Sequence, residues 1–401
     1  MDGFKALTGK QMKKVIGLDV CKNSVVACIL DAVRPTEPRQ LYYDANFPRF
    51  YADTAGIKAL LALKPDIAVM EPTGVNYMKI WATRLAEAGV EIVLVGHKQL
   101  RKYRENLDLP DKDDQADALA LACYYLEHHA ALRRFVRTRD PVIAQIRDIV
   151  LRLHHLNRVQ SPIINRIRQD LAWQFPEANS KTLDAVLFWC WLAGTRRSSR
   201  YDNLYAATIG LGIKPETQES ALSICELKRR EQKLEMLMRQ LMKDGRFAAY
   251  RKVMRRFGFG ERVEALILSQ IYPLENYLGP DGLPEVKIRK GKVSGQPTKR
   301  HLSRRRLQKA LGVAPTREDS GDKKSSKKAG SQLCRMALWQ WLFTRIEPQR
   351  SRVKNDVGSY LGELLDTEKK TRPIKLARSR VCSKAVDLLF RELVKEIVSE
   401  Q

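Results

Sequence analysis

The first hundred residues alternate between strand-like and helix-like segments, and this order constrains the fold more than any other feature of the sequence. Segments rich in β-branched or aromatic residues come first, at 13–21, 24–31 and 39–47. Helix-like and strand-like patterns then alternate, with helices at 54–63, 77–89 and 97–106 and strands at 66–74 and 91–96. We therefore expect a mixed α/β domain in which a three-strand meander precedes alternating helices and strands.

The rest of the chain is expected to be mostly helical. Apolar residues recur at helical spacing in 111–130, 140–178 and 216–256. The last two segments predict either a long antiparallel helix pair or a coiled coil between subunits. The turn-rich stretch 191–212 between them predicts an exposed connection.

The C-terminal part begins with a glycine turn and ends with a predicted helix at 374–399. Between them, 280–306 is broken by Gly and Pro and has no acid after Glu285, which predicts a flexible arm that becomes ordered on a polyanion. We divide the chain into three parts: an α/β domain at 1–135, a long-helix or coiled-coil region at 136–252, and a mainly helical domain at 253–401.

The composition indicates a nucleic-acid partner. Lys and Arg number 72 against 46 Asp and Glu, which gives a net charge of +26. A positive field of this size attracts polyphosphates, while 44% hydrophobic residues are enough for real cores. The seven cysteines form no CxxC pair, so we expect reduced thiols. With no apolar signal core and no apolar run of about 20 residues, we expect no export, no membrane span and a cytoplasmic protein.

Acidic residues stand at unusual places in this basic chain. Asp19 lies inside the apolar strand VIGLDVC, and Glu71 ends the strand of AVMEPTG. A carboxylate in such a place needs a partner, and a divalent cation is a suitable one. In KDDQADALALA, Asp114 and Asp117 are three apart and share a helix face, although an N-cap at Asp114 with Asp117 in the first turn is the commoner arrangement. The four acids together favour a site for Mg²⁺ or Mn²⁺ that serves phosphoryl transfer.

The stretches GLDVCK, AVMEPTG and KDDQADALALA together resemble the N-terminal DEDD domain of the transposases of insertion-sequence family one-ten. The resemblance resumes at RRFGFGERVEALILSQI and KALGVAPTREDSGDKKSSKKAGSQLCRMAL, and it covers about residues 13–130 and 253–345. It implies a RuvC-like, RNase H-like first domain, in agreement with the strand order, and a mainly helical C-terminal serine transposase domain. The residues Asp19, Glu71, Asp114 and Asp117 match the DEDD positions.

The resemblance also implies a function. In this family a serine attacks a DNA phosphodiester, the acids hold the metal, and a non-coding bridge RNA pairs with both element and target DNA. Ser320 of the SG pair is the matching nucleophile, although Asp322 stands beside it and Ser325 and Ser326 are rival hydroxyls. The implied protein is a homo-oligomer, a dimer or a tetramer, that acts on DNA in a bacterial or archaeal cell.

Clusters of cations are expected to bind nucleic acid. Arginines mixed with Tyr201 and Tyr205 suit RNA loops and single strands, and the other clusters suit phosphate backbones. The predicted contacts are Arg196, Arg197, Arg200, Lys287, Arg289, Lys290, Lys292, Arg304, Arg305, Arg306, Lys323, Lys324, Lys327 and Lys328.

Two other functions remain open from the sequence. One is a metal-dependent RuvC-like junction endonuclease that uses water as its nucleophile, so that Ser320 has no catalytic part. The other is a non-catalytic nucleic-acid-binding protein in which the acids no longer work. The leading hypothesis is a transposase that cuts and rejoins DNA through a serine.

Overall fold

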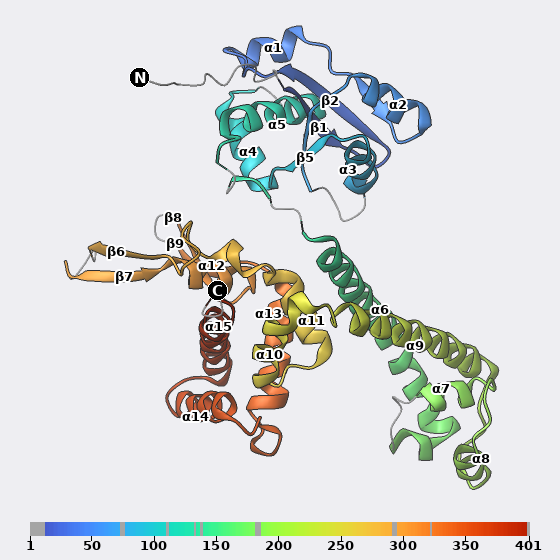
Figure 1. The fold of residues 1–401 in the computed structure, drawn as a ribbon. Helices are drawn as coiled ribbons and strands as arrows, with labels where there is room; N and C mark the ends of the chain where they lie inside the picture. The colour runs from blue at the N-terminus through green and yellow to red at the C-terminus, as the bar shows by residue number, and fades with distance from the viewer. Residues whose placement is uncertain are drawn as a thin grey trace. The chain divides into compact units, whose positions relative to one another are not determined.

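The computed structural model describes residues 13–72, 77–109, 112–131, 134–136, 139–180, 186–290, 295–320 and 323–398, the backbone alone at 179–180, 316–320 and 323–328. The chain divides into two compact units, Met1–Arg139 and Asp140–Gln401. Each is described by itself (Figure 1). The three-part division expected from the sequence stays a prediction.

The first unit is built on one five-stranded sheet. Its strands are β1 (Lys14–Val20), β2 (Ser24–Asp31), β3 (Arg49–Tyr51), β4 (Ile67–Met70) and β5 (Glu91–Leu94), in the order β3-β2-β1-β4-β5. The first three pair antiparallel, whereas β4 pairs parallel with β1 and β5 pairs parallel with β4. The RNase H-like fold expected for this part is thereby confirmed.

Helices cover both faces of this sheet, as Figure 1 shows. On one face α5 (Asp114–His128) and α4 (His97–Asn106) bury Val15 of β1. On the other face α2 (Thr54–Ala62) and α3 (Tyr77–Glu87) bury Ile16 and Leu18. Because side chains alternate along a strand, Gly17 and Asp19 lie on the same face as Val15, toward α5.

The prediction of a strand at 39–47 is wrong. This segment contains α1 (Pro38–Asp44), and the third strand begins only at Arg49. Pro38 occupies the first turn, where its fixed φ favours a helix. Leu41 and Ala45, four residues apart, pack against the core beneath α5, which is helical and not strand spacing.

The second unit contains a long antiparallel helix pair, α6 (Pro141–Gln174) and α9 (Pro215–Leu241). The start of α6 shares a core with the end of α9, through Ile143 and Met238, and the end of α6 shares another with the start of α9, through Leu171 and Ile224. The antiparallel pair is thus the arrangement within one chain.

The prediction of an exposed connection at 191–212 is wrong in part. This stretch and the residues before it form α7 (Val186–Leu192) and α8 (Ser199–Ala206), which close a small core at the far end of the helix pair. Phe188, Trp189 and Tyr201 are buried there. Cys190 and Cys225 form a disulfide in the same core, so the expectation of reduced thiols is wrong for this pair.

The remaining elements form the C-terminal core. The helices are α10 (Ala248–Arg256), α11 (Glu261–Ile271), α12 (Leu302–Ala310), α13 (Gln332–Trp341), α14 (Asp356–Thr371) and α15 (Ile374–Val398). Short 3₁₀ segments of this core lie at Gly245–Phe247, Leu274–Tyr277 and Gln349–Ser351, and a π turn lies at Leu342–Ile346, whereas the 3₁₀ segment Pro176–Ser180 belongs to the small core beside α7 and α8. Two hairpins project from this core: β6 (Val286–Lys290) with β7 (Pro297–His301), and β8 (Pro315–Ser320) with β9 (Lys323–Lys328).

The expected flexible arm is a paired ribbon followed by α12, and Ser320 lies in the β8–β9 hairpin. Among the described residues, no helix has the length and apolarity needed to cross a membrane.

Gly17 provides a direct test of the packing between β1 and α5. A Cβ at this position would lie 2.0 Å from the Ala118 carbonyl oxygen and 2.8 Å from the Ala122 nitrogen, both backbone atoms of α5. We expect Gly17→Ala to lower the free energy of unfolding by roughly 2–3 kcal/mol, because the helix must move off the sheet. Urea unfolding measures this change. Gly245→Ala is the control, since a Cβ there meets nothing within 4 Å; equal effects of the two changes would contradict the predicted role of Gly17.

Candidate metal centre

The two strand acids lie at one edge of the sheet. Leu18 of β1 is paired in register with Met70 of β4, and Asp19 and Glu71 follow these residues directly. Because β1 and β4 are parallel, their carboxyl ends meet at the same edge. Asp19 is half-buried between the buried residues Leu18 and Val20, so its carboxylate is partly removed from water.

The start of α5 separates its aspartates into different roles. Asp113 is the N-cap, and its carboxylate accepts a hydrogen bond from the Ala116 backbone N–H at 2.7 Å. The alternative in which Asp114 is the cap is therefore wrong by one residue. Asp114 and Asp117 lie in the first turn, with their carboxylates free for other contacts.

Asp19 and Asp114 come together across the interface between β1 and α5. One ligand atom each from Asp19, Cys21 and Asp114 lies within 4.8 Å of the others. The Cys21 thiol donates to Asp114 at 3.5 Å, and the Arg49 guanidinium donates to the same carboxylate oxygen at 2.8 Å. This group of three is compact enough to surround one cation.

Glu71 and Asp117 line a cavity of about 490 Å³ beside α4. His97 contacts Glu71, with Nδ1 2.7 Å from the carboxylate oxygen, and Arg104 forms an ion pair with Asp117. Cys21, Arg49 and Arg104 were not predicted as part of this site. A single cysteine, or a basic residue at the end of a strand or on a helix facing it, is too common a feature to single these residues out.

The electrostatics of Asp19 distinguish it from the other three acids. Burial, followed by the nearby carboxylates of Asp114, Asp117 and Glu71, raises the pKa of its carboxyl group to about 7. Among the described residues, no ion pair includes Asp19, whereas Arg49, Arg104 and His97 contact the other acids. A cation stabilises a half-buried acid among like charges, and a divalent ion held by Asp19 and Asp114 would fit this donor set.

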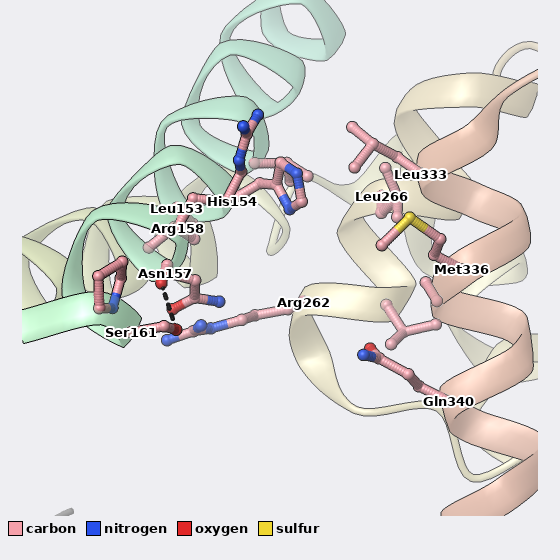
Figure 2. Close-up of a pocket in the computed structure, with 14 residues that line it drawn as sticks. Leu153, His154, Asn157, Arg158, Ser161, Arg262, Leu266, Leu333, Met336 and Gln340 are labelled. Atoms are coloured by element: carbon pink, nitrogen blue, oxygen red, sulfur yellow. Dashed lines mark hydrogen bonds between the residues drawn. The ribbon is translucent and has the colours of Figure 1, made fainter. Parts of the chain in front are cut away.

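The C-terminal unit has a larger cavity of about 510 Å³ with different chemistry. Figure 2 shows side chains from α6, α11 and α13 around it, including Leu153, Leu266, Leu333 and Met336. Arg262 at its rim is held by Glu231 and Glu235. The described residues that line it include no carboxylate, which is the ligand that Mg²⁺ prefers.

Ser320 is the last residue of β8, and its backbone pairs with Lys323 at the end of the hairpin. Ser325 and Ser326 pair with Glu318 and Arg317 further along the ladder. Side chains in this hairpin lie outside the described part, including those of Lys323, Lys324, Lys327 and Lys328.

The predicted nucleic-acid cations fall into different environments. Arg196, Arg197 and Arg200 are exposed, but Tyr201 beside them is only 5% exposed, so its ring belongs to the core and is not a surface for stacking bases. The Tyr205 hydroxyl accepts a hydrogen bond from the Ile213 N–H at 3.0 Å. The tyrosines thus have structural roles.

The basic residues of α12 are mostly used within the fold. Arg304 lies 3.5 Å from the buried Asp387, and Arg306 forms an ion pair with Glu285, whereas Arg305 is exposed. Lys287, Arg289 and Lys290 lie exposed on β6, and Lys292 falls outside the described residues.

An RNase H-like domain that gathers carboxylates at one sheet edge defines a class: metal-dependent enzymes of phosphoryl transfer on nucleic acids. Two family models agree with this class. The model for the DEDD transposase domain of IS110 elements matches residues 16–176, and the model described as transposase IS116/IS110/IS902 family matches residues 292–356. The chain belongs to the IS110 transposase family, and it is an enzyme that acts on DNA in transposition.

The DEDD model also implies dependence on a divalent metal, and the cluster of Asp19, Cys21 and Asp114 is in keeping with it. No curated protein matches the chain.

The raised pKa of Asp19 predicts a pH-dependent stability. Between pH 3.8, the ordinary pKa of an aspartate, and about pH 7, Asp19 keeps its proton in the folded chain and loses it in the unfolded chain. Stability contributed by this group is therefore full below pH 4 and lost as the pH rises to about 7. We expect Asp19→Asn to remove this loss and to stabilise the metal-free protein at pH 8 by on the order of 2 kcal/mol.

Chemical denaturation in a chelator at pH 5 and pH 8 measures the effect of Asp19→Asn. Asp31→Asn, at an exposed carboxylate at the end of β2, is the matched control. If wild type and Asp19→Asn showed the same pH dependence of stability, the raised pKa of Asp19 would be contradicted.

Proposed function

We propose that this enzyme cuts and rejoins DNA through Ser320, assisted by Mg²⁺ or Mn²⁺ at Asp19, Glu71, Asp114 and Asp117, at sites chosen by a bridge RNA. The observation that carries the metal part is the approach of Asp19 to Asp114, with no basic partner for Asp19 in the described part of the chain. The serine and the RNA rest on the family resemblance.

Asp19 and Asp114 are the proposed core of the metal site, with Glu71 and Asp117 at its sides. The bound ion would stabilise negative charge on the phosphoryl oxygens of the DNA. Arg49, 43% exposed beside Asp114, is placed to donate to a phosphate as well. Arg104 and His97 hold Asp117 and Glu71 in place before DNA arrives, which reduces the cost of ordering them.

Ser320 is the proposed nucleophile. Its hydroxyl oxygen forms a bond to phosphorus as one bridging P–O bond of the DNA breaks, the hydroxyl proton is released, and the leaving strand oxygen gains a proton. A serine hydroxyl needs activation, which the lysines of β9 and the metal would supply. The position of Ser320 at the end of the β8–β9 ladder supports it over Ser325 and Ser326, which pair inside the ladder.

The serine and the acids belong to different units of the chain. We propose that they act on one phosphate, either within one chain or between protomers of a dimer or tetramer. The overall charge of +26 would draw the element DNA, the target DNA and the bridge RNA onto such an assembly.

The nucleophile is tested with DNA from the regions that flank the gene. We expect wild-type protein with Mg²⁺ to give a covalent protein–DNA adduct that survives denaturation, because the serine becomes esterified. Ser320→Ala loses cleavage and adduct but keeps Mg²⁺ binding in calorimetry, whereas Asp19→Asn loses all three. Loss of activity of roughly 10³-fold or more is expected for each variant.

Ser325→Ala and Ser326→Ala are the matched controls and should keep the adduct. If Ser320→Ala cleaves without an adduct, the enzyme uses water, as in a junction endonuclease. If one of the control variants loses the adduct instead, the nucleophile is that neighbouring serine.

The guide is tested by sequencing the RNA that co-purifies with the protein from cells carrying the whole element. We expect one structured RNA encoded beside the gene, with loops complementary to the element ends and to the insertion site. Its pairing would choose the DNA while the protein recognises backbone and shape. Random RNA fragments would contradict the guided mechanism and leave the metal and serine proposals untouched.

A further inference from the structure

The β6–β7 ribbon projects from the C-terminal unit as an isolated pair of strands (Figure 1). Its register pairs Val286 with His301, Lys287 with Arg300, Ile288 with Lys299, Arg289 with Thr298, and Lys290 with Pro297. All of these residues are exposed except Thr298, which is half-buried. An isolated two-stranded ribbon is marginally stable in water, so its presence requires another explanation than core packing.

The root of the ribbon is held firmly to α12 by Glu285. The Glu285 backbone N–H donates to the Ser303 hydroxyl at 2.8 Å, and its carbonyl accepts from the Leu302 N–H at 2.9 Å. Its carboxylate forms the ion pair with Arg306. These contacts fix the direction of the ribbon at its root, while the strands themselves are not packed into the core.

The two faces of the ribbon differ. Val286 and His301, directly paired, line a cavity of about 410 Å³ together with Phe390 and Arg391 of α15, so this face is turned toward the body of the unit. Paired residues share a face and the next pair lies on the opposite one. The outward face consequently carries Lys287, Arg289, Thr298 and Arg300.

The charge on the outward face is not balanced within the ribbon. Residues 286–301 contain no acid. Lys287 lies 3.6 Å from Glu285 at the root, yet it also stands directly opposite Arg300, and like charges in that position destabilise a strand pair. A polyanion held against this face would remove the repulsion.

We propose that the outward face of the β6–β7 ribbon enters the major groove of duplex DNA, with Arg289 and Arg300 reading guanine edges and Lys287 contacting phosphate. The major groove of B-form DNA, about 12 Å wide, admits a two-stranded ribbon, whereas the deep, narrow major groove of A-form RNA does not. Thr298 donates its hydroxyl to the Arg289 carbonyl at 3.0 Å, so the donors left for base edges are the arginines. The proposal rests on the action of this transposase on DNA and adds a contact by the protein itself to the guided choice of sequence.

The test compares two double variants of the full chain that each remove two positive charges from the same ribbon. Arg289→Gln with Arg300→Gln removes both arginines from the outward face. Lys290→Gln with Lys299→Gln removes two lysines from the opposite face. The probes are a short mixed-sequence DNA duplex and an RNA duplex of the same sequence. Binding is measured by fluorescence anisotropy at several salt concentrations, in a chelator that prevents cleavage.

We expect the arginine pair to weaken DNA duplex binding roughly tenfold or more, and the lysine pair by less than about threefold. Methylation of guanine N7, a major-groove atom, should be blocked by wild-type protein and by the lysine variant and restored in the arginine variant. A conservative variant, Arg289→Lys with Arg300→Lys, keeps the charge but loses the forked donors, so N7 protection should fall while the salt dependence is kept.

Three results would overturn the proposal: equal weakening by the arginine and lysine pairs, equal weakening of RNA duplex binding, or N7 protection that persists in the arginine variant. Thermal unfolding of each variant confirms that the exposed ribbon can be changed without loss of the fold. Because binding is measured without metal and without cleavage, failure of the serine or metal proposal leaves this result unaffected.

Discussion

The close packing of α5 on β1 is the constraint on which the first unit depends. Gly17 lets the helix backbone approach the strand until no Cβ fits between them. Asp19 lies two residues after Gly17 on the same face of β1. The close approach of α5 therefore brings Asp114 next to Asp19. If α5 lay further from the sheet, the four acids would be separate surface groups, and Asp19 would lose the burial and the neighbouring carboxylates that raise its pKa.

That packing collects like charges, and the surrounding residues partly compensate. Arg49, Arg104 and His97 contact three of the four acids, and Asp113 uses its charge to cap the helix. Asp19 lies among carboxylates and forms no ion pair with any residue that the structure describes, which is unfavourable for a metal-free protein and favourable for one that binds a divalent ion. The crowding of carboxylates around Asp19 therefore destabilises the metal-free protein, and in our proposal the same crowding favours binding of a divalent ion.

Much of this unit could be predicted from the sequence because its signals are local. The apolar strands around Asp19 and Glu71 and the helix that starts at Asp114 follow from periodicity alone, and so do the acids that stand out against them. The helix at Pro38–Asp44 was missed because aromatic residues suit strands as well as helices, and packing against the α5 core decided between them. The N-cap is Asp113 and not Asp114, because an aspartate is an equally good N-cap at either position and the sequence alone does not decide between them.

The contacts that the sequence hid are those between distant segments. Arg49 reaches Asp114 over 65 positions, and the Cys190–Cys225 disulfide closes over 35, with no local pattern for either. The tyrosines near Arg200 were taken for stacking surfaces because composition does not tell a buried ring from an exposed one. The proposal of Ser320 as the nucleophile rests on the family resemblance, since a Ser-Gly pair alone predicts a turn.

The positive charge of the second unit is divided between the fold and its partners. Arg262, Arg304 and Arg306 are held by Glu231, Asp387 and Glu285, where they bind elements together. The ribbon cations are the reverse case: they lie within an acid-free stretch, Lys287 stands opposite Arg300, and the ribbon extends away from the core. The same residue types thus serve two purposes, and the position of the acids decides which. Glu285 marks the division, because it pairs with Arg306 and Lys287 at the root and is the last acid before the cations of residues 289–301.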